Sequence, residues 1–135
     1  MNDGPQGFRA AIPGSTTAFP SALSVAAGWD RDGARAWGAA IGEEFAGKGA
    51  GMMLGPAMNV ARLPTCGRNF EYLSGEDGAR GAAMVSEVVT GVQSKGVIAN
   101  AKHYIHNNQE FQRNTVDAVV DTRTHTEIYL PPFAA

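Results

Sequence analysis

The stretch EDGARGAAMVSEVVTGVQSKGVIANA, residues 76–101, decides the fold. Its first part places apolar residues at the three- and four-residue spacing of one helix face: Met84, Val85, Val88 and Val92. Ser74 and Asp77 have the spacing of a capping box, so we expect a helix over residues 76–95. The short apolar run over residues 97–101 then predicts a strand.

The residues before this stretch show the same pattern. Residues 30–48 place apolar side chains on one helical stripe, at Ala34, Trp37, Ile41 and Phe45. We expect the side chains on this stripe to form part of the hydrophobic core. The run Met52-Met53-Leu54, bounded by glycines, predicts a strand covered on both faces. Helix, strand, helix and strand in this order favour right-handed crossovers and a parallel sheet, which is an α/β fold with its loops gathered at the strand C-terminal ends.

The remaining segments are less regular. Residues 3–20 are rich in proline and glycine and are expected to form an irregular surface loop. Residues 56–75 form a long connection, and long loops inside a compact domain are usually functional. A further helix is predicted from about Thr124 toward Pro131-Pro132, with His125 exposed in its first turn.

Composition limits the function classes. The 135 residues fit one domain, and 44% hydrophobic with 18% charged residues excludes intrinsic disorder. The net charge of −2 gives no basic footprint, so we expect no nucleic-acid partner and no membrane partner. The single cysteine, Cys66, can neither close an internal disulfide nor build a cysteine-based zinc site. The first residues lack the parts of a targeting signal, so we expect none, and the compartment stays open.

Polar side chains stand in three places where loops are expected to follow strands. They are Asp3, Arg68 with Glu71, and the pair Lys102-His103. Strand ends of a parallel sheet converge on one rim, so these groups can meet around one polyhydroxylated ligand. Asp3 can accept hydrogen bonds from two neighbouring hydroxyls, whereas Arg68 and Lys102 can donate them. His103 can do either, and such a set suits a sugar.

A structural interpretation of the same residues stays open. Arg68 and Glu71 can simply pair to hold the long loop. Lys102 can be a solvated strand end. Asp3 lies so near a chain terminus that a role in a site is least expected there.

A metal site is a weaker alternative. His103, His106 and Glu110 would share one face if their segment were helical. The segment follows a strand directly, however, contains Asn107-Asn108 and lacks the His-Glu-x-x-His order of a metallohydrolase. We therefore expect no metal and no other cofactor.

Six motifs occur in the order of one known family and cover almost the whole chain. They are DGPQGFR at 3–9, TAFP at 17–20, LGPAMNV at 54–60, GRNFEY at 67–72, KH at 102–103 with NNQE at 107–110, and EIYLPPF at 127–133. On these motifs the chain resembles the family three glycoside hydrolases, in particular the branch of β-glucosidases and β-xylosidases. The resemblance implies a partial (β/α)8 barrel: residues 1–135 belong to the N-terminal catalytic domain and supply roughly its first two to three β/α units, with no second domain.

The resemblance also implies roles for the polar residues. Asp3 is expected to bind hydroxyls of the non-reducing terminal sugar, and Arg68, Lys102 and His103 are expected to be the other polar residues that bind this sugar. Glu71 is expected to support them without touching the sugar. The family has a cis peptide bond between the residues that match Lys102 and His103. The branch of N-acetylglucosaminidases is disfavoured, because His106 and its neighbours do not form the Pro-Gly-His-Gly loop of that branch, and His106 is assigned no catalytic role.

The resemblance places catalysis outside this chain. Retaining hydrolysis needs two carboxyl groups about 5–5.5 Å apart, one as nucleophile and one as acid/base. The family carries the nucleophile in a Ser-Asp-Trp motif on a later strand and the acid/base glutamate in a further domain, and the resemblance gives neither duty to a residue here. We therefore expect an inactive fragment of an exo-acting, retaining β-glucosidase that supplies half of the sugar subsite.

The expected partners are a β-glucoside or short β-linked oligosaccharide and the remainder of the parent polypeptide. The family is often secreted or periplasmic. Three alternatives stay open: a β-xylosidase, a non-catalytic carbohydrate-binding or scaffold protein of the same fold, and a metallohydrolase that uses His103 and His106.

Overall fold

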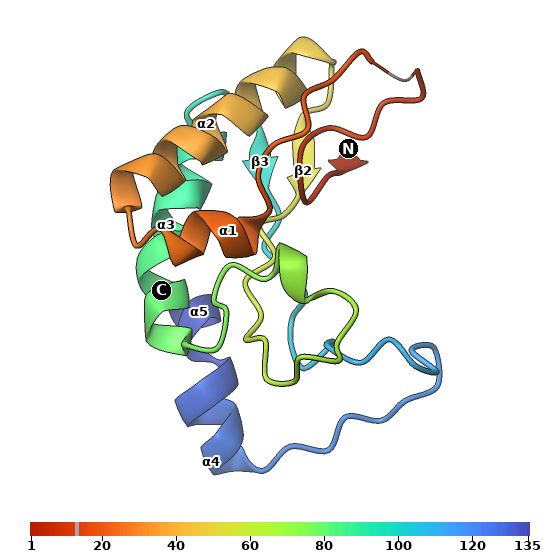
Figure 1. Cartoon of the computed structure of the whole chain (residues 1–135), viewed down its shortest axis with the longest axis vertical. Coiled ribbons are helices and arrows are strands. Elements are labelled where there is room, and N and C mark those ends of the chain that lie inside the picture. The colour runs from red at the N-terminus through yellow and green to blue at the C-terminus, as the bar shows by residue number, and fades with distance from the viewer. Residues whose placement is uncertain (13) are drawn as a thin grey trace.

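Three short parallel strands lie against two long helices in the computed structural model, which describes residues 1–12 and 14–135 (Figure 1). The elements are, in order, β1 (Asn2–Asp3), α1 (Ala22–Ala27), α2 (Arg31–Gly47), β2 (Met52–Leu54), the 3-10 turn η1 (Asn69–Glu71), α3 (Gly78–Gln93), β3 (Ile98–Ala99), α4 (Thr122–Thr124), the π-helical turn η2 (His125–Tyr129) and α5 (Pro131–Ala134).

The sheet has the strand order β1-β2-β3, and both pairs are parallel. Asp3 pairs with Leu54, and Met53 pairs with Ala99. Helix α2 lies between β1 and β2 along the chain, and α3 lies between β2 and β3, so the chain forms two consecutive β/α units. The predicted α/β architecture is confirmed. The connections that leave β2 and β3 lie on the same side of the sheet, below it in Figure 1.

The two long helices bury the stripes that the sequence predicted. The buried side chains include Ala34, Trp37, Ile41 and Phe45 of α2 and Met84, Val85, Val88 and Val92 of α3. Glycines let the helix backbones approach closely, because a Cβ on Gly91 would clash with the Arg35 carbonyl oxygen. Burial of these apolar stripes is the main contribution to stability in this layer.

The start of α3 corrects one expectation. Asp77 caps the helix, and its Oδ1 accepts from the backbone N–H groups of Ala79 at 2.8 Å and Arg80 at 3.3 Å. Ser74 takes no part in a capping box. It is fully buried and donates from Oγ to the Met58 carbonyl oxygen at 2.6 Å, because the long connection folds back under the helix.

The N-terminal segment corrects a second expectation. Residues 3–20 are not wholly irregular, since Asp3 belongs to β1 and pairs with β2. Two residues of strand are too short to show a periodic pattern. Helix α1 was missed for the same reason, although Ser21, whose Oγ accepts from the Ser24 N–H, and Gly28 mark its ends.

The C-terminal segment begins earlier than predicted and contains a break. Asp121, rather than Thr124, is the N-cap of α4, and its Oδ1 accepts from the Thr124 N–H at 3.0 Å. The helical path then widens into η2 and resumes as α5 at Pro131, a residue that cannot donate a backbone hydrogen bond.

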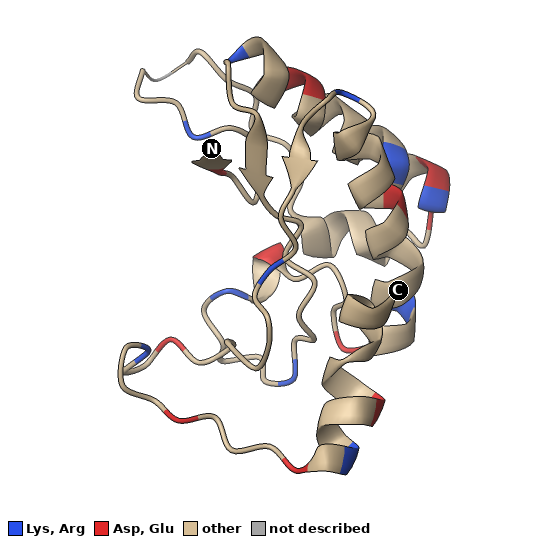
Figure 2. Ribbon diagram, turned by 180° about the vertical axis from the view of Figure 1, so that it is seen from behind, with Lys and Arg blue, Asp and Glu red and all other residues tan. Residues whose placement is uncertain are grey.

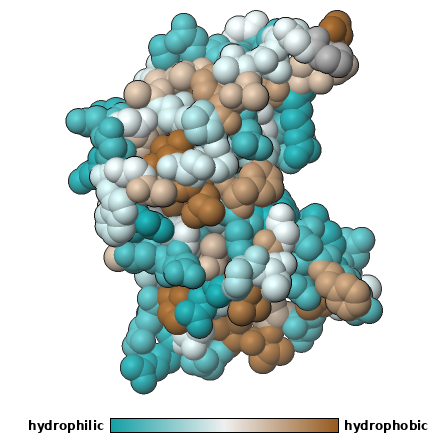
Figure 3. Space-filling view, viewed as in Figure 1, coloured by the Kyte–Doolittle hydropathy of each residue, from teal (hydrophilic) through white to brown (hydrophobic). Residues whose placement is uncertain are grey.

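The surface carries several exposed apolar side chains in addition to charged ones. Figure 3 shows hydrophobic patches over the middle and lower parts of one face. Large exposed hydrophobic residues include Leu63, Ile98, Tyr104, Phe111 and Val119. In the part of the chain that the structure describes, no helix is both long and apolar enough to cross a membrane.

Candidate functional site

The structure brings all the predicted site residues together at the C-terminal ends of the strands. Asp3 ends β1, Arg68 and Glu71 lie at η1 in the connection after β2, and Lys102-His103 follows β3. We call these five residues the strand-end cluster. Their joint position follows from the parallel sheet, because strand ends that point the same way deliver their loops to one rim.

Asp3 and Lys102 make the contact that joins the two outer strands. Lys102 Nζ donates to Asp3 Oδ1 at 2.7 Å, and the Lys102 side chain is only 12% exposed. Partial burial works to raise the pKa of Asp3, but the hydrogen bond and the charge of Lys102 outweigh it and hold that pKa below its ordinary value. Asp3 is therefore an ionised acceptor. The alternative in which Lys102 is a solvated strand end is wrong.

Glu71 lies between the two cations of the cluster. Arg68 Nε donates to Glu71 Oε1 at 2.5 Å, and Lys102 Nζ lies 3.4 Å from Glu71 Oε2. Burial works to lower the pKa of Arg68, but the hydrogen bond and charge of Glu71 outweigh it and raise that pKa. The Glu71 side chain is 4% exposed. Glu71 thus holds Arg68 and Lys102 together, and its supporting role beside a sugar stays a prediction.

His103 is held as a neutral imidazole. Arg68 Nη2 lies 2.5 Å from His103 Nε2, and because a guanidinium can only donate, Nε2 must accept and the ring proton lies on Nδ1. Burial, followed by the charges of Arg68 and Lys102, lowers the pKa of His103 to about 4. The peptide bond between Lys102 and His103 is cis.

Two residues around the cluster were missed as contacts by sequence reasoning. Glu110 Oε1 lies 3.2 Å from Arg68 Nη1, and Asn59 makes two hydrogen bonds to the main chain of His103. Both occur in motifs that carry the family resemblance, but no local pattern shows which residue each will contact.

The segment after His103 does not form the helix that a metal site would need. It runs as turns, and His106 Nε2 contacts His125 Nδ1 at 3.1 Å instead of facing His103. The expectation that His125 is exposed is wrong, because this contact leaves it half-buried. In residues 1–12 and 14–135, no three His, Cys, Asp or Glu side chains form a group that could hold a metal.

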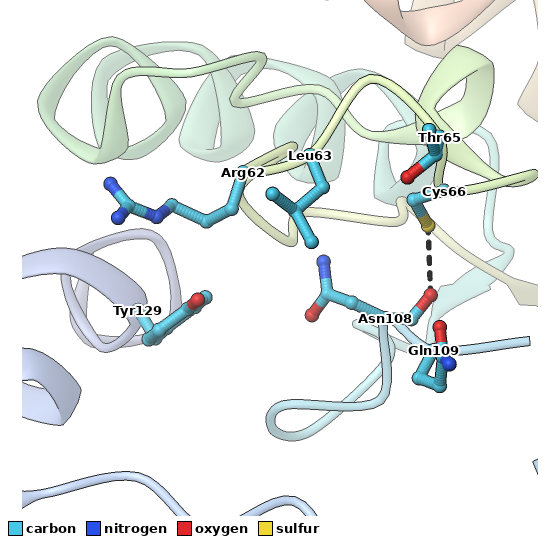
Figure 4. A pocket seen from close by; sticks show the side chains of 7 residues that line it. All are labelled: Arg62, Leu63, Thr65, Cys66, Asn108, Gln109 and Tyr129. Atoms are coloured by element: carbon cyan, nitrogen blue, oxygen red, sulfur yellow. Dashed lines mark hydrogen bonds between the residues drawn. The ribbon is translucent and has the colours of Figure 1, made fainter.

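A pocket of about 300 Å³ lies beside the cluster, between the two long connections and η2 (Figure 4). Its lining comprises Arg62, Leu63, Thr65, Cys66, Asn108, Gln109 and Tyr129. The Cys66 thiol donates to the Asn108 carbonyl oxygen at 2.8 Å, which ties the two connections together. None of the five cluster residues lines this pocket, so the polar groups of the cluster and this pocket are separate features of the surface.

Comparison with known proteins identifies the family. Residues 2–135 match the glycosyl hydrolase family 3 N-terminal domain. The thermostable β-glucosidase B of Acetivibrio thermocellus is 46% identical over 98% of this chain, and β-glucosidase BoGH3A of Bacteroides ovatus is 42% identical over 100% of it. In each case the chain spans 19% of the relative's length.

Solved structures agree. β-Glucosidase 3B of Thermotoga neapolitana, solved with α-D-glucose, is 45% identical, with a TM-score of 0.89 over 98% of this chain and 19% of its own. The β-glucosidase DesR of Streptomyces venezuelae, solved with D-glucose, is 35% identical, with a TM-score of 0.91 over 98% of this chain and 17% of its own. The two β/α units are thus part of a (β/α)8 barrel, and the chain belongs to glycosyl hydrolase family 3, in the N-terminal domain of that family.

Proposed function

We propose that this chain forms one wall of the sugar site of an exo-acting β-glucosidase. In this proposal the whole enzyme releases terminal, non-reducing β-D-glucosyl residues with retention, from a β-glucoside or a short β-linked oligosaccharide. Residues 1–135 are part of its N-terminal catalytic domain, which the remainder of the parent polypeptide completes.

The observation that carries the proposal is the strand-end cluster itself. Four polar groups from three separate segments converge there: the Asp3 carboxylate, the Arg68 guanidinium, the Lys102 ammonium and the His103 imidazole. Hydrogen bonds in which one partner is charged are stronger than neutral ones, so a ring of such groups suits a ligand with several neighbouring hydroxyls.

The chemistry of the cluster favours binding over proton transfer. Asp3 is kept ionised by Lys102, so it accepts hydrogen bonds from hydroxyls and is a poor general acid. Glu71 is hydrogen-bonded to Arg68 and buried, and we assign it no nucleophilic role. We assign the two catalytic carboxyl groups of a retaining glycosidase to the rest of the enzyme.

The relatives support glucose as the bound sugar. The β-glucosidases of Thermotoga neapolitana and Streptomyces venezuelae were solved with glucose, and both are similar to this chain over 98% of its length. A β-xyloside differs from a β-glucoside by the absence of one hydroxymethyl group. Comparison of the two substrates therefore belongs in the test.

The test is a hybrid enzyme in which residues 1–135 replace the matching segment of Thermotoga neapolitana β-glucosidase 3B. We expect the hybrid to hydrolyse an aryl β-glucoside. Asp3→Asn should lower kcat/KM by roughly 10- to 100-fold, since it removes one charge-assisted set of hydrogen bonds. Asp117→Asn is the matched control, because Asp117 is exposed.

Two results would contradict the proposal. One is a hybrid that melts cooperatively but has no glycosidase activity. The other is equal kcat/KM for Asp3→Asn and Asp117→Asn. A higher kcat/KM on the aryl β-xyloside than on the β-glucoside would overturn the assignment of glucose. Calorimetric titration of the hybrid enzyme with glucose gives a second measurement of the same site, with loss of binding expected in Asp3→Asn only.

A further inference from the structure

The main chain at Lys102 and His103 is held by two different means. At Lys102 the backbone continues the pairing of the sheet: its N–H donates to the Pro56 carbonyl oxygen at 3.1 Å, and its carbonyl oxygen accepts from the Met58 N–H at 2.8 Å. Ala57 forms the corresponding bridge with Lys102. This backbone pairing ends there, because the next residues of the β2 connection turn toward Gly75, whose carbonyl oxygen accepts from the Ala61 N–H.

At His103 a side chain replaces the missing backbone partner. Asn59 Oδ1 accepts from the His103 N–H at 2.6 Å, and Asn59 Nδ2 donates to the His103 carbonyl oxygen at 3.0 Å. Asn59 is 1% exposed. One carboxamide therefore satisfies both main-chain groups of one residue, as a neighbouring strand would.

We propose that Asn59 is the positioning residue of the strand-end cluster. Its carboxamide fixes the main chain of His103 and thereby positions the side chains of Lys102 and His103 to contact the sugar. The inference rests on the proposed function, and it adds a residue that does not itself touch the substrate. Lys102 extends from this main chain to Asp3 and Glu71, and His103 extends from it to Arg68.

The residue type matters at this position. A carboxamide has one acceptor and one donor at the spacing of a peptide group, so it can serve the N–H and the carbonyl oxygen of His103 at once. Leucine has the same number of side-chain heavy atoms and the same branching, but it has neither group. Aspartate keeps the acceptor and loses the donor while it is ionised, and regains a donor when it is protonated.

The test uses the hybrid enzyme with Asn59→Leu, Asn59→Asp and the control Ser74→Ala. Ser74 is also fully buried and also donates to a main-chain carbonyl, that of Met58, but among the described residues its side chain makes no hydrogen bond to the cluster. We expect Asn59→Leu to lower kcat/KM at least roughly tenfold, because a buried peptide group loses both partners.

Asn59→Asp, the gentler change, should approach the wild-type kcat/KM as the pH falls through the pKa of the new carboxyl. Ser74→Ala should change stability without this loss of kcat/KM.

A second measurement separates positioning from general destabilisation. In the hybrid enzyme the His103 imidazole, followed by NMR and assigned with His103→Gln, should not titrate near pH 6.5. Arg68 donates to the ring, and burial together with the charges of Arg68 and Lys102 lowers its pKa more than Glu71 and Asp3 raise it. In Asn59→Leu the ring should leave Arg68 and titrate near its ordinary pKa of about 6.5. Ser74→Ala should leave the titration unchanged.

The outcomes distinguish this inference from the proposed function. If Asp3→Asn has no effect on the hybrid, the sugar site itself is wrong. If Asp3→Asn lowers kcat/KM but Asn59→Leu matches Ser74→Ala in both kcat/KM and the His103 titration, the sugar site stands and the role of Asn59 is overturned.

Discussion

Glu87 and Glu71 each lie between two cations and are both largely buried, but their surroundings differ. In the helical layer, Glu87 of α3 contacts Arg31 at 2.5 Å and Arg35 at 2.6 Å, both from α2. At the strand ends, Glu71 contacts Arg68 at 2.5 Å and Lys102 at 3.4 Å. Figure 2 shows charged residues in both regions, along the outer helices and around the loops below the sheet.

The difference lies in the exposure of the cations and in where their remaining contacts lead. Arg31 and Arg35 are 61% and 55% exposed, so water surrounds most of each guanidinium. Arg68 and Lys102 are 17% and 12% exposed, and they extend to His103, Glu110 and Asp3. An ion pair whose arginines are surrounded by water can join two helices but does little more. A network of charged groups that is shielded from water holds its donors and acceptors in fixed directions. The same charge pattern thus joins two helices in one place and, in the function that we propose, binds a ligand in the other.

Replacement of the two glutamates should give the largest difference between the regions. Glu71→Gln removes the most buried counter-charge of two poorly hydrated cations and leaves Arg68 only Glu110 and Lys102 only Asp3. An uncompensated buried charge costs about 3–5 kcal/mol, so we expect a loss of stability somewhat below that range. Glu87→Gln leaves two cations that water already solvates, so its loss of stability should be clearly smaller. Urea denaturation of the 135-residue chain and both variants measures this. Equal shifts of the two midpoints would show that the comparison is wrong.

Replacement of one lysine in the strand-end cluster and one in the helical layer extends the comparison to sugar binding. Lys102→Gln removes a donor of the cluster and frees Asp3, so it should lower the affinity for glucose by roughly 10- to 100-fold. Lys95→Gln breaks the pair that Lys95, just after α3, makes with Glu43 of α2 at 3.1 Å, and it should leave the affinity unchanged. Calorimetric titration of the hybrid enzyme with glucose measures the affinity of both variants. A similar affinity for the two would show that Lys102 does not bind the sugar.

The sequence predicted the helical layer better than the contacts of the loops. The stripes of α2 and α3 are periodic over several turns, so a local pattern was sufficient. The gathering of loops at one rim followed from the predicted parallel sheet, and the family resemblance named Asp3 and Lys102 among the residues that meet there. Helix α1, with six residues, was too short to show such a pattern.

The partners of buried polar groups could not be predicted in this way. The contact of Asn59 with His103 and that of Arg68 with Glu110 span 44 and 42 residues of sequence. Such contacts depend on how two connections lie against each other, and no spacing within either connection contains that information. Ser74 shows the same problem, since a plausible local capping partner was instead used in a contact across the loop.

The stability of the strand-end cluster should also depend on pH, by a moderate amount, because the cluster contains the buried imidazole of His103. The folded chain keeps His103 neutral down to about pH 4, whereas the unfolded chain protonates it near pH 6.5. Unfolding therefore takes up a proton between these values, so this contribution is fully present above pH 6.5 and is lost as the pH falls toward 4. His103→Gln should flatten the pH dependence of the urea midpoint in that range. Parallel curves for the variant and the wild type would contradict a buried neutral imidazole.

Salt should give the smallest effect and should act only on the helical layer. Mobile ions screen exposed pairs, so raising the NaCl concentration to about 1 M shortens the screening length to about 3 Å and should weaken the contact of Glu87 with its arginines. Arg35→Gln should therefore lower the urea midpoint slightly at low salt and not at all at high salt. Glu71→Gln should lose nearly the same stability at both salt concentrations, because its cations are shielded from solvent. If salt removed the effect of Glu71→Gln as well, the strand-end cluster would be as solvated as the pair between the helices, and its fixed geometry for a sugar would have no physical basis.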